Sequence, residues 1–342
     1  MALKERQTVA DIGEFGLIER FAARLGAPPE GETWAGDDSA VLRAPGSTLL
    51  YTTDLLIEAI DFDMGYASGA DIGWKALAVN VSDIAAMGGR PHHAVVGLGL
   101  TADCPLDTAD GILDGFLAAA SRWDVQLVGG DISSASALVL YVALIGVAEA
   151  EPIRRSGARP GDAICVTGVL GGAAGGLALL RAGAAVEEAA RRRLVARQLR
   201  PEARLEEGRR LAALGATAMI DVSDGLIGDL VHLLDASELG CSVVPEAVPV
   251  DPDLVPLREV LDPLEAALTG GEDFELLFTL AEDTVQRARE SLAELGTPVA
   301  RLVANDREPL GGYGSLRGRI TIADDFDELP EDMAEAFGML ER

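Results

Sequence analysis

The chain has 342 residues, which exceeds the usual size of a single domain and predicts two, and its 49% hydrophobic content excludes a disordered chain. Its 28 Lys and Arg against 56 Asp and Glu give a formal net charge of −28. This charge excludes nucleic acids and anionic membrane surfaces as partners, because both would repel the chain. Any phosphate-bearing substrate must therefore be met by metal ions or by locally placed Arg and Lys.

The cysteines and the apolar runs indicate where the protein works. Cys104, Cys165 and Cys241 form no CxxC pair, which excludes a disulfide framework or a zinc cluster and fits a reducing cytoplasm. The N-terminus is polar and has no apolar signal core. The longest apolar run, residues 137–148, is too short to span a bilayer. We expect a cytoplasmic protein without a membrane span.

The first half of the chain predicts a sheet covered by helices. The pattern favours helices over 15–25, from residue 73 onward (the central helix) and over 107–121. It favours strands ending near 42 and over 48–56, 92–100, 125–132 and 137–149. In the helix over 107–121, one face carries Ile112, Leu113, Phe116, Leu117 and Ala120, which we expect to be buried.

The central stretch Gly73–Pro91 places a carboxylate, Asp83, inside an apolar helical pattern. The cation that precedes it in the run is Lys75, two turns back. A carboxylate on a largely buried helix needs a partner, and a metal ion is one that suffices. Two other interpretations are open: Asp83 caps a local turn, or the helix breaks near Val81 and Ser82.

A domain boundary is predicted near residues 149–161, where charge, Gly and Pro gather, giving domains 1–150 and 151–342. The second half alternates strands, turns and helices: a strand from 163, a glycine-rich turn over 168–176 and a helix; a strand near 218, an acidic turn and a helix; a strand near 276; a helix over 283–295 and a strand near 299. The glycine-rich turn has neither a GK[ST] ending nor dinucleotide-binding spacing, so close helix–strand packing explains it best. The fold class is α+β, with a mixed or antiparallel first sheet whose helices lie on one face, followed by an α/β second domain.

Acidic residues recur where strands meet loops. They are Asp37 and Asp38, Asp54, Asp83, Asp131, Asp221 and Asp224, and Glu272 and Asp273. Taken singly, each fits a turn or a helix cap, and Asp221 stands where the N-cap of the following helix is expected. Taken together they would repel one another unless cations intervened, and oxygen ligands on several loops suit Mg²⁺ that also holds nucleotide phosphates. His92 and His93 are interpreted as structural and His232 as a surface or packing residue, and no GxSxG elbow is present.

Seven motifs in order resemble a known family, the thiamine-monophosphate kinases of the aminoimidazole ribonucleotide synthetase-like ATP-binding superfamily. They are GDDSAVL, TTDLLIE, KALAVNVSDIAAMGGRP, LVGGD, RRSGARPGD, AMIDVSDGLIGDL and GGEDFELLFT. The resemblance covers residues 15–279. It implies Mg²⁺-dependent transfer of the γ-phosphoryl group of ATP to the phosphate of thiamine monophosphate, and a homodimer formed through the N-terminal domains.

The resemblance also implies roles for individual residues. Those that resemble metal ligands are Asp38, Thr52, Thr53, Asp54, Asp83, Asp131, Asp221 and Asp224. Those that resemble nucleotide contacts are Gly130, Asp131, Arg155 and Ser223. Arg155, Asp83 and Asp221 are expected to be catalytic, and Asp61, Glu272 and Phe326 to lie at the acceptor. The acceptor phosphate is ionised near neutral pH, so no general base is required.

Three positions depart from the family pattern. Asp61 stands where the family has His, Ile132–Ser133–Ser134 replaces Thr-Thr-Arg, and Phe326 is the nearest match to a C-terminal aromatic. Asp61 either contacts a cationic acceptor or belongs to an ordinary exposed acidic turn. Two other functions stay open: another ATP-dependent enzyme of the superfamily that acts on a different small metabolite, and a nucleotide-binding paralogue without turnover.

Overall fold

The computed structural model describes residues 28–33, 37–44, 46–182 and 186–302. The helix expected over 15–25 and the predicted acceptor residue Phe326 lie outside these residues.

The first half forms a five-stranded sheet with the order β1-β2-β5-β3-β4. Its strands are β1 (Ala40–Ala44), β2 (Ser47–Ile57), β3 (Arg90–Leu100), β4 (Gln126–Ser134) and β5 (Val139–Ala148). The β3–β4 pair is parallel and the other pairs are antiparallel, which confirms the predicted mixed sheet. The register sets Asp54 opposite Val142 and Thr52 opposite Leu144.

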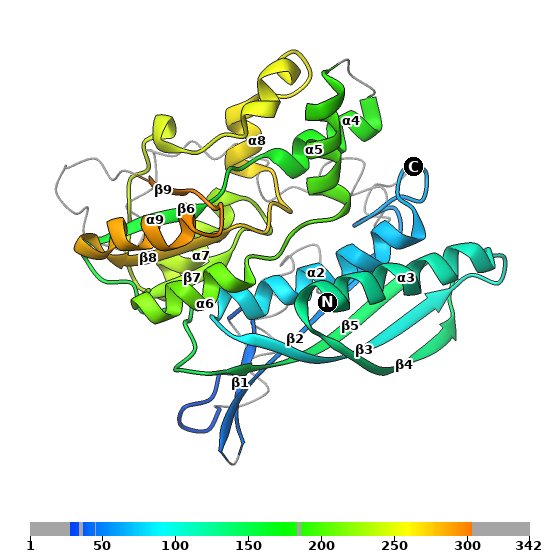
Figure 1. Cartoon of the computed structure of the whole chain (residues 1–342), viewed down its shortest axis with the longest axis horizontal. Coiled ribbons are helices and arrows are strands. Elements are labelled where there is room, and N and C mark those ends of the chain that lie inside the picture. Colours follow the sequence, from blue (N-terminus) through cyan, green and yellow to red (C-terminus); the bar gives the residue numbers. More distant parts are fainter. Residues whose placement is uncertain (1–27, 34–36, 45, 183–185, 303–342) are drawn as a thin grey trace, which may run out of the picture.

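Two helices, α2 (Gly69–Ala86) and α3 (Leu106–Trp123), cover one face of this sheet (Figure 1). Helix α2 begins before the predicted start at residue 73 because Ser68 and Asp71 form a capping box. The helices pack backbone to backbone: a Cβ on Gly73 would lie 2.0 Å from the carbonyl oxygen of Ile112. Helix α2 runs on to Ala86, so the interpretation that it breaks near Val81 and Ser82 was wrong.

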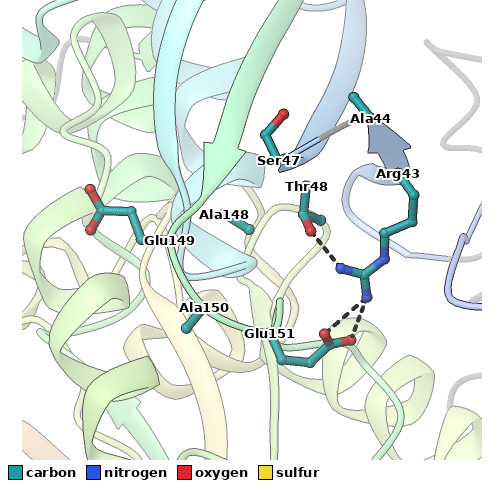
Figure 2. Close-up of a pocket in the computed structure, with 9 residues that line it drawn as sticks. Arg43, Ala44, Ser47, Thr48, Ala148, Glu149, Ala150 and Glu151 are labelled. Carbon is teal, nitrogen blue, oxygen red and sulfur yellow. Dashed lines mark hydrogen bonds and ion pairs between the residues drawn. The ribbon is translucent and has the colours of Figure 1, made fainter.

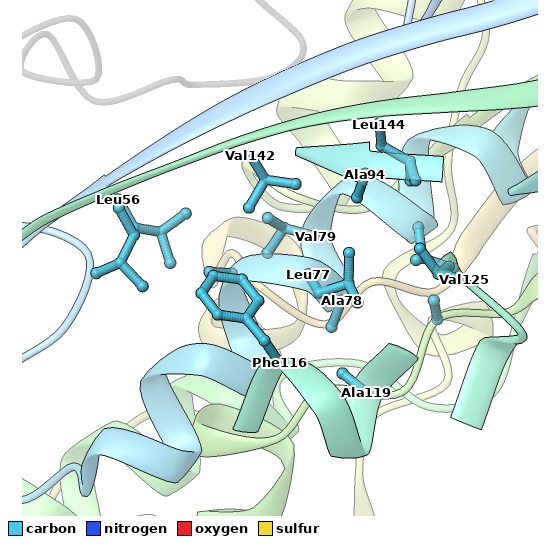
Figure 3. Close-up of a cluster of buried hydrophobic side chains, with 14 of the residues drawn as sticks. Leu56, Leu77, Ala78, Val79, Ala94, Phe116, Ala119, Val125, Val142 and Leu144 are labelled. Carbon is cyan, nitrogen blue, oxygen red and sulfur yellow. The ribbon is translucent and has the colours of Figure 1, made fainter. Parts of the chain in front are cut away.

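The first-half core lies between α2, α3 and the sheet (Figure 3). Phe116 of α3 and Leu77 of α2 are fully buried there together with Val142 and Leu144 of β5. Leu113 and Leu117, which the helical pattern placed on the buried face, are each 51% exposed. That prediction was wrong because α3 is the outer helix, and α2 and the sheet cover a narrower stripe of it than its apolar positions span.

The other face of the sheet carries exposed apolar side chains. They are Tyr51 and Leu55 of β2, Val95 of β3, and Tyr141 and Ile145 of β5. Directly paired residues point to the same face of a sheet, and Tyr51 pairs with Ile145 while Leu55 pairs with Tyr141. These five residues define what we call the open face.

The second half forms a four-stranded sheet with the order β7-β8-β6-β9. Its strands are β6 (Asp162–Thr167), β7 (Ala218–Asp221), β8 (Leu276–Ala281) and β9 (Val299–Leu302). Every pairing described in this sheet is antiparallel, so the second half has α+β character like the first.

The helices of the second half are α4 (Gly172–Ala182), α5 (Glu188–Leu199), α6 (Leu205–Leu214), α7 (Leu226–Ala236), α8 (Pro263–Thr269) and α9 (Val285–Ala293). Within the described residues, 3₁₀ turns lie at Pro245–Ala247, Pro252–Leu257 and Glu282–Thr284. The sequence did not predict α5, α6 or α8. A Cβ on Gly176 of α4 would lie 2.2 Å from the carbonyl oxygen of Leu194 of α5. The glycine-rich segment therefore does serve close packing, but between two helices rather than between a helix and a strand.

Helix α2 joins the two halves. Ala85 and Ala86, at its C-terminal end, belong to the second-half core together with Leu211, Met219 and Leu276. Figure 1 shows α2 between the five-stranded sheet and the second half. The central element predicted from the sequence is thus also the central element in space.

Among the described helices, none combines the length and the apolar composition that crossing a bilayer requires.

Candidate active site

Three carboxylates from distant parts of the chain meet beside α2. Asp38 precedes β1, Asp83 lies on α2 and Asp221 ends β7. One oxygen of each lies within 4.8 Å of the others. Strands β1 and β7 belong to different sheets, so the cluster forms where the two halves meet.

Hydrogen bonds from neighbouring side chains orient this cluster. Thr52 Oγ1 of β2 donates to Asp83 Oδ2, and Ser82 Oγ donates to Asp221 Oδ2 over 2.5 Å. Asp54 of β2 is close enough to Asp83 for the two carboxyl groups to affect each other's pKa. Thr52 and Asp54 reach the cluster because their side chains point to the helix-covered face, as their register opposite buried residues of β5 requires.

The structure rules out the capping interpretations of these residues. Asp83 lies inside α2, whose end is marked by Met87. Asp221 is the last residue of β7, and α7 begins five residues later with Gly225 as its N-cap. Both carboxylates therefore point into the cluster without serving a helix terminus.

Arg155 is the cation that pairs with this cluster within the described part of the chain. Its Nη2 lies 2.9 Å from Asp38 Oδ1, and its backbone N–H donates to Asp37 Oδ1 over 3.1 Å. Burial works against its charge, but the carboxylates of Asp38, Asp37 and Asp221 outweigh burial and raise its pKa, so it stays protonated. Its Nε is buried without a hydrogen-bond partner among the described residues.

The carboxylates of the cluster resist ionisation in the absence of cations. Burial, and next to it the charge of Asp38, raises the pKa of Asp221 to about 8. Burial also raises the pKa of Asp83 well above its usual range, helped by Asp54 and Asp221. The pKa of Asp54 rises to about 6 for the same reasons, burial first and then the charge of Asp61.

The donor set fits a hard divalent cation. Buried carboxylates gathered at this spacing are stabilised when a cation offsets their repulsion, and Mg²⁺ prefers such oxygen ligands. Asp38 Oδ2 and Asp54 Oδ2 are buried and find no hydrogen-bond partner within the described part of the chain. These two oxygens are therefore free to coordinate an ion.

Two predicted metal ligands lie on the opposite face of the sheet. Thr53 is exposed, and its hydroxyl donates to the carbonyl of Val142 over 2.7 Å. Asp131 of β4 is exposed and follows Gly130. Asp131 lies three strands from β2, or about 14 Å at the usual strand spacing. The structure therefore does not bring Asp131 to the cluster of its own chain.

Gly130 has a structural reason to be glycine. A Cβ at this position would lie 2.0 Å from the carbonyl oxygen of Val96 on the neighbouring strand. The close approach of β3 and β4 thus explains the residue independently of any contact with a nucleotide.

The loop between β7 and α7 holds Ser223 and Asp224 at the rim of the cluster. Both backbone N–H groups donate to Asp229 Oδ2, over 3.0 and 3.2 Å. Asp229 is buried on α7 and was not singled out from the sequence, although its position five residues after Asp224 places it one turn into that helix. The Asp224 side chain itself is exposed.

The predicted acceptor residues Glu272 and Asp61 meet at Lys75 of α2. The Lys75 ammonium group lies 2.5 Å from Glu272 Oε1 and donates to the backbone carbonyl of Asp61 over 3.0 Å. Gln198 Nε2 donates to Glu272 Oε2 over 2.5 Å. The Asp61 carboxylate accepts the N–H of Ile57 over 2.7 Å, so it is half-buried within its own turn rather than directed to solvent.

Sequence reasoning missed Ser82, Gln198 and Asp229, and gave Lys75 no place at the acceptor. Ser82 and Asp229 adjoin predicted ligands in sequence, so proximity was an available signal. Lys75 offered a signal as well, because a lysine within an apolar helical run has to find an anion. Gln198 lies in a helix that the sequence did not predict.

A separate hollow of about 420 Å³ opens near the β1–β2 hairpin (Figure 2). Its lining includes Arg43, Thr48 and Glu151. The Arg43 guanidinium donates to Thr48 Oγ1 over 2.5 Å and to Glu151 Oε2 over 3.0 Å. None of the residues expected to act in catalysis or binding lines it.

Comparisons with known proteins identify the family of this chain. The family model for the AIR synthase related protein N-terminal domain matches residues 36–148, and that for its C-terminal domain matches residues 159–307. A thiamine-monophosphate kinase of Salmonella typhimurium is 39% identical over 292 residues, which cover 84% of this chain and 88% of that protein.

Two solved structures are also similar. "AaThiL complexed with AMPPCP and TMP" superposes with a TM-score of 0.80 at 31% identity, covering 90% of this chain and 95% of that one. The thiamine-monophosphate kinase of Stenotrophomonas maltophilia gives a TM-score of 0.70 at 36% identity, covering 87% and 96%.

Proposed function

The chain belongs to the thiamine-monophosphate kinases of the AIR synthase related family, and from this membership we propose that it transfers the γ-phosphoryl group of ATP to the phosphate of thiamine monophosphate. The bond between the γ-phosphorus and the β–γ bridging oxygen breaks, and a bond to an acceptor phosphate oxygen forms. The products are ADP and thiamine diphosphate.

The observation that carries this proposal is the convergence of Asp38, Asp83 and Asp221 beside Arg155, in a fold shared with a protein solved with AMPPCP and TMP. An acceptor phosphate has a second pKa of about 6, so its oxygen is already nucleophilic at neutral pH. Catalysis then consists of bringing two anions into line and neutralising their charge. Arg155 stays charged and has a spare buried N–H at Nε for an oxygen of a phosphate.

We assign the cluster to Mg²⁺. The residues that would hold the ion are Asp38, Asp54, Asp83 and Asp221, with Thr52 beside them. Bound there, Mg²⁺ would neutralise charge on the phosphates of the nucleotide. Asp224 belongs to the rim, and Ser223 stands where the nucleotide could meet the β7–α7 loop.

We further propose that the protein is a homodimer formed through the open face. An apolar surface on one side of a sheet is normally covered, and a second copy of the same face is a self-complementary cover. Asp131 lies on the same side of the sheet as the open face. It pairs with Gly97 of β3, and Gly97 in turn pairs with Tyr141 of the open face on β5. Gly130 and Asp131 would then serve the partner's site rather than that of their own chain.

The domain boundary at 150/151 and the cytoplasmic location stay as proposals. β5 ends at Ala148 and β6 begins at Asp162, so the proposed boundary falls in the connection between the two sheets. The cysteines are unpaired, as a reducing compartment would keep them.

The experiment is a product assay with purified protein, ATP and Mg²⁺, run with thiamine monophosphate and with a panel of other phosphorylated metabolites. Thiamine diphosphate and ADP in equal amounts are expected from thiamine monophosphate. Product from a different acceptor would support another enzyme of the superfamily. Mg²⁺-dependent ATP binding without product from any acceptor would favour the paralogue without turnover.

A further inference from the structure

Lys75 is a buried cation that belongs neither to the proposed metal site nor to the proposed nucleotide site. Its residue is 3% exposed on α2. Burying an ammonium group is costly unless an anion and hydrogen-bond acceptors compensate it. Its ammonium group pairs with the carboxylate of Glu272 and donates to the backbone carbonyl of Asp61.

These two partners come from different halves of the molecule. Asp61 belongs to the turn after β2, and Glu272 belongs to the loop between α8 and β8. One ammonium group therefore ties together the two described residues that resemble acceptor contacts. The predicted acceptor subsite is organised around a residue that the family resemblance did not assign.

The loop that carries Glu272 needs to be held in place. Glu272 has φ +66° and Phe274 has φ +48°, values in the left-handed region that non-glycine residues seldom adopt. The backbone N–H of Glu272 donates to the carbonyl of Ser223 over 2.8 Å, and Gln198 binds one oxygen of its carboxylate. Lys75 binds the other oxygen and supplies the charge that compensates it.

We propose that Lys75 is a positioning residue of the acceptor subsite, which holds the Glu272 carboxylate for the acceptor and offsets its charge so that an anionic phosphate can enter. This inference rests on the proposed function. Without Lys75, the Glu272 and Asp61 carboxylates would face an incoming phosphate uncompensated. Lys75 is eight residues from Asp83, or about 12 Å along α2, so its effect should fall on the acceptor rather than on ATP.

A purely structural ion pair between the halves would behave differently, and the chain offers a matched control. Arg200 Nε lies 2.5 Å from Asp71 Oδ1, which also ties α2 to the second half. Arg200→Met breaks that pair without touching Glu272 or Asp61.

The test is steady-state kinetics of Lys75→Met, Glu272→Gln, the double variant and Arg200→Met, with thiamine monophosphate and ATP varied in turn. We expect Lys75→Met to raise the KM for the acceptor about ten- to a hundredfold, the range of one charge-assisted contact, while the KM for ATP changes less than about twofold. In the Glu272→Gln background the same change should add little, because Lys75 acts through Glu272. Arg200→Met should lower the melting temperature and leave both KM values unchanged.

Several outcomes would overturn the inference. An unchanged acceptor KM in Lys75→Met, or full additivity of the two substitutions, means that Lys75 does not position Glu272. If Lys75→Met does not fold, Lys75→Arg takes its place, with a smaller rise in acceptor KM that again disappears in the Glu272→Gln background. Wild-type protein that forms no thiamine diphosphate overturns the proposed function, and this inference falls with it. If the wild type is active and Lys75→Met leaves the acceptor KM unchanged, the inference is overturned and the proposed function stands.

Discussion

Replacing Asp83 by Asn tests whether the acidic cluster is a metal site. The substitution keeps the shape of the side chain and an oxygen that can accept from Thr52, but it removes the charge. If Asp83 binds a shared ion, turnover should fall by at least two to three orders of magnitude while the fold survives.

The magnitude follows from the geometry. Ligand oxygens of Asp38, Asp83 and Asp221 lie within 4.8 Å of one another. Two unit charges at that separation interact by about 3.5 kcal/mol at an effective dielectric constant of 20. A divalent ion loses at least this much attraction when one carboxylate is neutralised, which corresponds to more than two decades in affinity.

The same calculation gives a second, opposite expectation for stability. Without metal, Asp83 is repelled by its neighbours, and this repulsion raises its pKa. Asp83→Asn should therefore raise the melting temperature in EDTA and shrink the further rise that Mg²⁺ produces. Differential scanning fluorimetry with and without Mg²⁺ measures both, beside the product assay. Asp114→Asn, an equal charge change at an exposed position of α3, is the control and should behave as wild type.

One result would refute the reasoning. If Asp83→Asn destabilises the metal-free protein, keeps the full stabilisation by Mg²⁺ and retains activity, the carboxylate is a structural partner of Thr52 and the cluster is not a metal site.

Three further predictions follow from the same features. ATP should bind only with a divalent ion, because a chain of net charge −28 repels the bare nucleotide, and titration calorimetry that gives equal affinity in EDTA would count decisively against the metal assignment. The raised pKa values of Asp221, about 8, and Asp54, about 6, mean that the folded state binds more protons than the unfolded state above pH 4. The contribution of these two carboxyl groups to the stability of the metal-free protein should therefore decline as pH rises from about 4 to 8. The gain in melting temperature from Mg²⁺ should grow over the same range, and a gain independent of pH would contradict the assignment. Sedimentation should give twice the 35.6 kDa chain mass. Tyr141→Glu on the open face should yield monomers, whereas Leu113→Glu, which replaces an exposed apolar residue of α3, should leave the dimer intact. A wild-type monomer at micromolar concentration would rule out the dimer.

The sequence determined most of the local structure of this protein. The periodicity of apolar residues identified β2, β3, α2 and α3, because the spacing of side chains along a helix or strand is a property of the chain itself. The carboxylate of Asp83 within an apolar helix and the acidic residues at the strand ends marked the candidate site, again through the local sequence alone. A buried charge is improbable unless something compensates it, wherever the rest of the chain lies.

Only the tertiary structure decided which of these residues meet. It gathered Asp38, Asp83 and Asp221 and left Asp131 on the far side of the sheet, because a strand's register and neighbours decide which face and which element each side chain meets. It exposed Leu113 and Leu117, since periodicity defines an apolar stripe but not the width of what covers it. It also paired Lys75 with Glu272, 197 positions apart in the sequence: an ion pair depends on distance in space, which the order of residues along the chain does not contain.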